Sequence, residues 1–210
     1  DALMDPKSFF SKKTMSSDET KLAVTAATNA VPGDYTIAIE RRATASQLLS
    51  GENLTTGQTS TSALGFEGTF TIASQDTNEI GASDPKTLKQ ADITIASTDS
   101  LKDVITKINA TTKDSGISAT IIDGRLSFTD AQMGDRTISA TSTTDLADKL
   151  ALNPAAPGAA KATLATGNTA KIIVNNMITL ERNTNTITDA IEGMTLNLKG
   201  TTAGSSVSVS

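Results

Sequence analysis

The stretch DSLKDVITKINATTKDSGISATIIDGRLSF, residues 99–128, carries the two strongest structural signals of the chain. In its first part apolar residues recur at i, i+3, i+4 and i+7, and these are Leu101, Val104, Ile105 and Ile108. The spacing places them on one face of a helix, which we expect over about 100–110 and which Asp99 or Ser100 can cap. Such an apolar stripe could bind a partner, but a helix that packs on its own sheet is the commoner outcome.

The second part of this stretch predicts a β-hairpin. Apolar residues alternate on both sides of Asp123-Gly124. A tight primed turn needs positive φ at its central residues, and this dipeptide tolerates it. The Asp123 carboxylate could instead bind a cation, but it has no acidic neighbours at the spacing of a calcium loop. We therefore interpret it as a plain turn.

Most of the remaining chain alternates between apolar and polar residues, as strands do. The segments expected as strands are 21–28, 35–39, 66–72, 93–95, 170–174, 177–181, 194–198 and 207–209, and 43–49 is expected as a strand or an irregular crossing. A weaker helix is expected over 144–151, and Asn175-Asn176 is expected to form a turn. We predict a mainly β fold with minor α+β character: two β-rich domains, one inserted in the other, with one or two short helices.

Two segments without periodicity, 51–62 and 154–168, indicate linkers because Ser, Thr, Gly, Ala and Pro dominate them. Linkers on both sides of a self-contained middle predict an insertion, which exposed loops accept most readily. We expect 62–165 to be the inserted β-rich domain, with the helix at about 100–110. Residues 18–61 and 166–210 would then form one discontinuous β domain. Residues 1–17 would be a lead-in from a missing helical region.

The composition argues against several classes of function. The 210 residues include no Cys and no His, which removes disulfides, thiol nucleophiles and the commonest general base and metal ligand. The net charge is −5 and the basic runs are no longer than pairs, so nucleic acid is not an expected partner. The longest apolar run, near Ile172-Ile173-Val174, is far too short to insert in a membrane.

Acidic residues of the expected helices could in principle serve acid–base catalysis. They are Asp99, Asp103, Asp145 and Asp148. Carboxylates at this spacing usually form a solvated helix face. A carboxylate-based glycosidase would also need aromatic platforms, and the chain has one Tyr and no Trp. We therefore expect no enzyme, no catalytic residue, no cofactor and no metal site.

The basic pair Arg41-Arg42 lies beside an alternating strand. It could contact an acidic neighbouring subunit, and we retain both residues as possible subunit-interface residues. Charges that protect an edge strand from unwanted pairing explain the pair about equally well.

Three segments, in this order, together resemble the flagellar cap proteins, also called hook-associated protein 2. Residues 33–47 resemble the opening segment of that family, with Arg42 where the family has Leu. Residues 99–126 resemble the IN motif that flagellins and hook-associated proteins share. Residues 182–198 resemble the start of the family's C-terminal region, with Met194 in place of Val. The motif residues, to which we assign structural roles, are Tyr35, Ile37, Ile39, Leu101, Ile108, Asn109, Gly124, Asn185, Asp189, Gly193 and Thr195.

The resemblance implies an assembly role at the tip of the bacterial flagellar filament, where the cap promotes the folding and insertion of flagellin. It implies an extracellular protein exported by the flagellar secretion system. Its partners would be further copies of itself in a ring, flagellin and hook-associated proteins, with host surface glycans as another possible partner. The chain would hold the outer β domains and lack the coiled-coil helical arms.

Two other interpretations stay open. Exposed outer domains could act as an adhesin or host-glycan-binding module of the bacterial surface. Because flagellins share the IN motif, a flagellin or a hook–filament junction protein is the other alternative.

Overall fold

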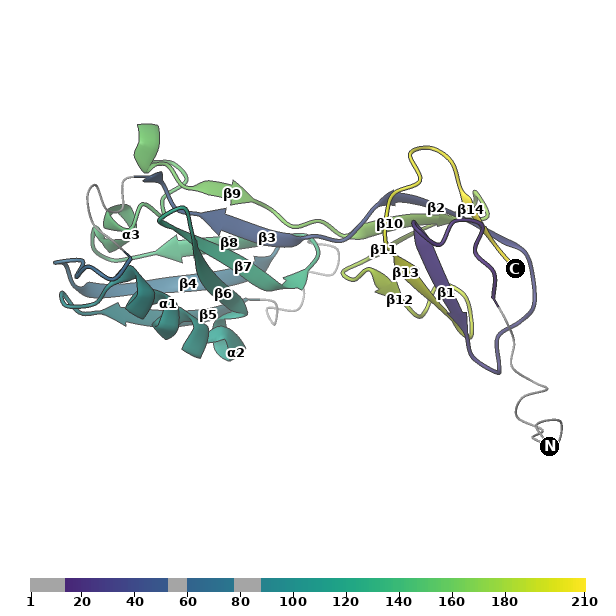
Figure 1. The fold of residues 1–210 in the computed structure, drawn as a ribbon, viewed down its shortest axis with the longest axis horizontal. Helices are drawn as coiled ribbons and strands as arrows, with labels where there is room; N and C mark the ends of the chain where they lie inside the picture. The colour runs from purple at the N-terminus through teal and green to yellow at the C-terminus, as the bar shows by residue number, and fades with distance from the viewer. Residues whose placement is uncertain (1–13, 53–59, 78–87) are drawn as a thin grey trace. The chain divides into compact units, whose positions relative to one another are not determined.

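The computed structural model describes residues 14–52, 60–77 and 88–210 and consists of two compact units (Figure 1). The discontinuous unit comprises Asp1–Thr44 and Thr169–Ser210, and the inserted unit comprises Ala45–Asn168. Both are built mostly from antiparallel strands, so the predicted mainly β class with short helices is confirmed.

The discontinuous unit contains two sheets with strand orders β11-β10-β2-β14 and β1-β13-β12. The strands are β1 (Leu22–Ala26), β2 (Tyr35–Arg41), β10 (Ala170–Val174), β11 (Ile178–Arg182), β12 (Thr186–Ile187), β13 (Met194–Leu198) and β14 (Val207–Val209). Alternate residues of both sheets are fully buried, among them Leu22, Ile37, Ile172 and Leu196. The alternation seen in the sequence therefore corresponds to one face of each sheet that packs into the core.

The inserted unit contains sheets of order β6-β7-β3-β9 and β5-β4-β8. Its strands are β3 (Ala45–Leu49), β4 (Gly68–Asp76), β5 (Lys89–Ile95), β6 (Ile117–Ile122), β7 (Arg125–Met133), β8 (Arg136–Thr141) and β9 (Thr163–Ala165). Its helices are α1 (Leu101–Ala110), α2 (Thr112–Ser115) and α3 (Leu146–Lys149), followed by a 3-10 turn at Gly158–Ala160. One core cluster joins both sheets and α1, and its largest fully buried side chains are Phe70 and Phe128.

The local signals of residues 99–128 form the predicted elements. Ser100 is the N-cap of α1 and makes a capping box with Asp103. Residues Asp123 and Gly124 join β6 to β7 with φ of 50° and 71°, as the primed turn requires. The Asn175-Asn176 turn also has positive φ at both residues, 51° and 54°. The weaker helix expected over 144–151 forms only the short α3.

The boundary between the units differs from the expected one. Strand β3, expected in the discontinuous domain, lies in the inserted unit between β7 and β9. The expected linker 154–168 contains β9, whose Leu164 is paired with Leu48. The alternating pattern of β3 shows that one face is buried, but it does not show which strands will cover that face. Within the other expected linker, 51–62, residues 53–59 lie outside the described part.

Two further segments are more regular than expected. Within the lead-in, of which residues 1–13 lie outside the described part, Met15 and Ser17 bond to the backbone of residues 208–210. The segment between the expected strands 177–181 and 194–198, where no strand was expected, contains the short strand β12, which pairs with β13.

The ends of each unit lie next to each other. Ser46 Oγ accepts a hydrogen bond from the Gly167 N–H at 2.9 Å, inside the inserted unit. Arg41 Nε donates to the Thr169 carbonyl at 2.7 Å, inside the discontinuous unit. The two crossings between the units are therefore adjacent on both sides of the boundary.

Candidate functional site

Asn109, the second residue of the IN pair, fastens α1 to the edge of a sheet. Its Oδ1 accepts the Ala119 N–H at 2.7 Å and its Nδ2 donates to the Ala119 carbonyl at 3.0 Å. Ala119 lies on the edge strand β6, where these backbone groups would otherwise lack a strand partner. A side-chain amide has the same donor–acceptor pair as a peptide group, so Asn109 replaces one residue of a missing strand.

Asn185 makes the same pair of side-chain hydrogen bonds to one residue's backbone in the discontinuous unit. Its Oδ1 accepts the Ala43 N–H at 2.8 Å and its Nδ2 donates to the Ala43 carbonyl at 2.9 Å. Ala43 follows β2 and is buried. Two motif residues that the sequence marks only as structural thus share one role, which is to satisfy both backbone groups of a residue at the margin of a sheet.

We expect Asn109→Ala to lower the free energy of unfolding by about 1 to 3 kcal/mol, because Ala119 then loses both partners at a partly buried position. Urea unfolding followed by circular dichroism measures this change. The control is Thr106→Ala on the same helix, an exposed position at which we expect a change within about 0.5 kcal/mol. Equal effects of the two substitutions would contradict the role assigned to Asn109.

The remaining motif residues lie in the core, in turns or in surface pairs. Leu101, Ile108, Ile37 and Ile39 are buried, and Tyr35 is half-buried at the start of β2. Gly124 forms the primed turn. Thr195 is paired with Thr25 across β13 and β1. Asp189 accepts hydrogen bonds from Arg182 at 2.9 and 3.1 Å, and these bonds lower the pKa of the Asp189 carboxyl.

At position 193, a residue with a Cβ atom cannot replace glycine without a shift of the backbone. Gly193 has a φ of +74°, and a Cβ atom added there would lie 2.6 Å from both the backbone N and the Cα of Ala30. The loop before β13 therefore packs directly on the backbone of the segment after β1.

The two arginines of the basic pair have different surroundings. Arg41 bonds to both the carbonyl and the hydroxyl of Thr169, at 2.7 and 2.6 Å, and contacts Glu181 at 3.5 Å. Arg42 is exposed and makes no side-chain hydrogen bond or ion pair with the described part of the chain. Arg41 thus has an internal structural role, and Arg42 is available at the surface. Whether either residue contacts another subunit stays a prediction.

The helix carboxylates hold local structure. Asp99 accepts a hydrogen bond from Lys107 that lowers the pKa of its carboxyl, and Asp103 has a lowered pKa because Ser100 donates to it. Asp145 pairs with Lys149 at 3.0 Å. Asp148 accepts a hydrogen bond from Asn153 at 2.9 Å. These four residues were expected to form a solvated face, and each also has a defined partner.

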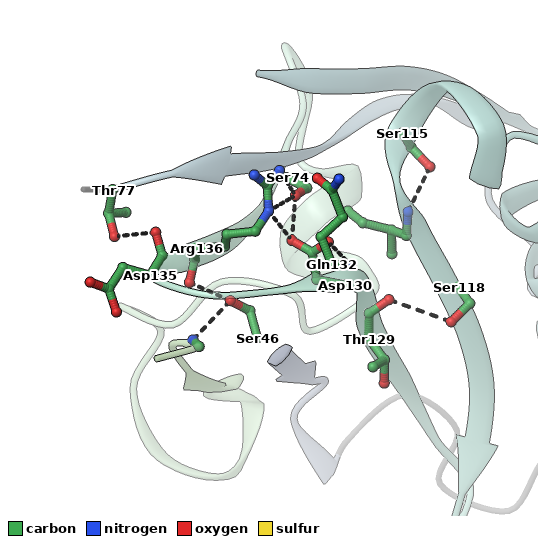
Figure 2. Close-up of polar contacts among 12 residues, drawn as sticks. Ser46, Ser74, Thr77, Ser115, Ser118, Thr129, Asp130, Gln132, Asp135 and Arg136 are labelled. Carbon is green, nitrogen blue, oxygen red and sulfur yellow. Dashed lines mark hydrogen bonds and ion pairs between the residues drawn. The ribbon is translucent and has the colours of Figure 1, made fainter. Parts of the chain in front are cut away.

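A buried charged cluster in the inserted unit was not anticipated from the sequence. Arg136 Nε lies 2.9 Å from Asp130 Oδ2, and Arg136 also donates to Ser74 Oγ at 2.6 Å. Figure 2 shows Ser74, Asp130 and Arg136 directed at one another, while Ser46 donates to the Arg136 carbonyl. Ser74 also donates to Asp130. The cluster joins β4, β7 and β8 through groups that have all found partners, so it is structural.

No metal or membrane feature appears in the described ranges. They contain no group of three or more Asp, Glu, His or Cys that could hold an ion. No helix in them is long and apolar enough to cross a bilayer.

The discontinuous unit has an exposed apolar hairpin and, separately, a hollow with apolar lining residues. At the β10–β11 hairpin, Met177 is 79% exposed and Ile178 is 56% exposed. Elsewhere, Val31, which is 55% exposed, lines a hollow of about 490 Å³ together with the buried Ala30 and Met194. Large exposed apolar side chains that cluster are typical of protein-interaction surfaces.

Three family models match separate parts of this chain. "Flagellar hook-associated protein 2 N-terminus" matches residues 1–46, "Flagellin hook IN motif" matches 69–132, and "Flagellar hook-associated protein 2 C-terminus" matches 167–210. The first and third end and begin within a few residues of the boundary between the two units. Comparison with curated protein sequences gave no match.

Solved structures of similar fold cover most of the chain. The D2-D3 domains of the flagellar cap protein FliD from Escherichia coli are 27% identical, with 94% of this chain and 97% of that chain covered and a TM-score of 0.69. The D1-D2-D3 domains from the same organism are 28% identical, with a TM-score of 0.70, and 96% of this chain covers 55% of that one. FliD (HAP2) from Pseudomonas aeruginosa shares the fold at 23% identity, with a TM-score of 0.66 and coverage of 90% and 83%.

Proposed function

This chain belongs to the flagellar hook-associated protein 2 family, the flagellar cap proteins, and we propose that it forms the outer part of a cap that promotes the folding and insertion of flagellin. The observation that carries this proposal is the order of the matches. The N- and C-terminal cap models lie on the two halves of the discontinuous unit, and the IN motif lies inside the inserted unit. The cap-specific matches also favour a cap protein over a flagellin or a hook–filament junction protein.

Its role would be structural and would depend on contacts between protein surfaces. We propose that copies associate through exposed residues of the discontinuous unit, with Arg42 and the Met177 hairpin as contact points. Flagellin and hook-associated proteins would be the other partners, at an extracellular site on the filament tip reached by flagellar export. No observation in the described residues favours an adhesin or host-glycan-binding role, which stays a prediction.

We expect the full-length protein that contains this chain to restore filament growth in a bacterium that lacks its own cap. Met177→Asp should shorten or abolish those filaments, because it places a charge at a proposed contact. Electron microscopy of filament length measures the effect. The matched control is Ile122→Asp, an equal change at a hairpin of the inserted unit where Ile122 is 54% exposed.

Two outcomes would contradict this proposal. If the exported, folded wild-type protein forms no filaments, the cap function is wrong. If Met177→Asp behaves like wild type, the hairpin is not a contact point. Immunoblots of secreted protein keep a failure of export separate from both.

A further inference from the structure

We propose that the groove along β8 in the inserted unit binds an extended segment of an incompletely folded flagellin subunit, which adds to β8 as a further strand. The inference rests on the proposed function, because it names how the cap would hold a subunit before insertion. The groove has a volume of about 480 Å³ and is lined by β8, by α3 and the segment after it, and by Leu48 of β3 and Leu164 of β9.

The first argument is the direction of the backbone groups of β8. In an antiparallel pair, successive residues direct their N–H and C=O alternately toward the partner strand and away from it. The Thr77 N–H donates to the Asp135 carbonyl at 2.7 Å, so odd-numbered residues face β4. The Arg136 carbonyl faces the other way and accepts the Gly167 N–H at 3.0 Å. By the same alternation, the N–H and C=O of Ile138 and Ala140 point away from β4.

These backbone groups lie beside the groove. Ile138 and Ala140 both line it, and among the described residues no strand, side chain or loop pairs with their outward N–H and C=O. Before Ile138 along β8, the outward carbonyl of Arg136 is already occupied by the Gly167 N–H. The groove therefore offers two donor–acceptor pairs, spaced two residues apart, to an incoming backbone.

The second argument is that several other sheet edges in the chain are occupied. On β5, Lys107 Nζ donates to the Thr94 carbonyl at 3.0 Å. On β6, the Asn109 amide occupies both groups of Ala119. On β11, the Arg182 guanidinium donates to the Glu181 carbonyl at 2.7 Å. Such side chains prevent edge-to-edge pairing, and the part of β8 beyond Arg136 has no equivalent among the described residues.

The third argument is the chemistry of the groove wall. Leu48 and Leu152 form a buried apolar floor, and the hydroxyls of Thr141, Ser142 and Thr144 form a polar rim. A strand with alternating side chains would direct one set at the floor and the other at the rim. The charged group of the groove is the Asp148 carboxylate, and the chain carries a net charge of −5. A segment with basic or neutral residues is therefore preferred over an acidic one.

A groove that binds by strand addition would accept bound segments of many different sequences. Main-chain hydrogen bonds supply the affinity in strand addition, and the side-chain sites supply the selectivity. Two donor–acceptor pairs and a short apolar floor give a weak, reversible complex, which a subunit can leave as it folds.

The test uses a fluorescein-labelled peptide of about ten residues that alternates Val and Thr and ends in two lysines, a length typical of a long strand. Fluorescence anisotropy measures its binding to this chain, and hydrogen exchange measures protection of the Ile138 and Ala140 amides. We expect saturable binding that slows exchange at these two amides. The same peptide with alternate backbone nitrogens methylated should lose binding by about tenfold or more, because it cannot donate to β8.

The matched variants carry proline on opposite edges of one sheet. Ala140→Pro removes an outward N–H without removing a bond to β4, and edge strands tolerate proline at such positions. We expect it to weaken peptide binding about fivefold to tenfold. Gln90→Pro makes the same change on β5, whose outward side is away from the groove, and should leave binding unchanged.

Three results would overturn the inference: no binding of the unmodified peptide, equal binding of the methylated peptide, or protection of other amides in place of Ile138 and Ala140. The methylated peptide gives this answer even if Ala140→Pro does not fold. Because the assay needs no filament, its failure would leave the proposed cap function standing. Failure of filament growth would in turn leave the peptide result unchanged.

Discussion

Replacement of Asp130 by Ala is expected to lower the free energy of unfolding by about 3 to 5 kcal/mol, which would unfold much of the inserted unit under mild denaturing conditions. The side chains of Asp130 and Arg136 are 0% and 5% exposed. Removal of the carboxylate takes the Asp130 charge away from the buried guanidinium and deprives Ser74 Oγ of its acceptor. Denaturant titration of the chain, followed by circular dichroism, measures the loss.

Two controls separate burial of charge from general damage. Asp145→Ala breaks the exposed pair with Lys149, and we expect a loss of at most about 1 kcal/mol. The double variant Asp130→Leu with Arg136→Met removes both charges and should regain most of the stability, because apolar replacements of buried pairs are often neutral or stabilising. A single Asp130→Ala variant as stable as Asp145→Ala would disprove the importance of the cluster.

Gly193→Ala is expected to destabilise the discontinuous unit by about 2 to 6 kcal/mol, as the sum of two costs. A residue with a Cβ at φ of +74° is strained by about 1 to 3 kcal/mol. The added carbon would also lie 2.6 Å from the Ala30 backbone, and the backbone shift needed to relieve this overlap costs about 1 to 3 kcal/mol more. Thermal and urea unfolding of the variant measure the total.

Gly124→Ala is the matched control for Gly193→Ala. Gly124 has nearly the same φ, +71°, but nothing lies within 4 Å of the position of an added Cβ. Only the conformational cost of about 1 to 2 kcal/mol should remain. Similar losses at the two glycines would show that the close approach to Ala30 is relieved without cost.

The features predicted correctly are those that neighbouring residues determine. The stripe from Leu101 to Ile108 and the cap at Ser100 lie within one helix. The turns at Asp123-Gly124 and Asn175-Asn176 follow from the φ that their own residues tolerate. Each of these signals is complete within about a dozen residues, so the rest of the fold need not be known.

The features that were missed depend on contacts between distant segments. The pattern of β3 is the same whichever sheet receives it, and its partner β9 follows more than a hundred residues later, in a segment rich in Ala, Pro and Gly. Ser74, Asp130 and Arg136 meet only after β4, β7 and β8 have come together. The sequence did mark Asn109 and Asn185 through the family resemblance. It gave no sign that their amides would each bind the backbone of a single residue.

Within each unit, a hydrogen bond holds together the two chain ends at which the units join: Gly167 to Ser46 in one and Arg41 to Thr169 in the other. The inserted unit could therefore be exchanged for another domain. The chain leaves the discontinuous unit after Thr44 and returns to it at Thr169. Removal of residues 45–168 would therefore leave a gap that a very short linker closes. A guest of another size or surface could occupy the same place without any change in the host sheets.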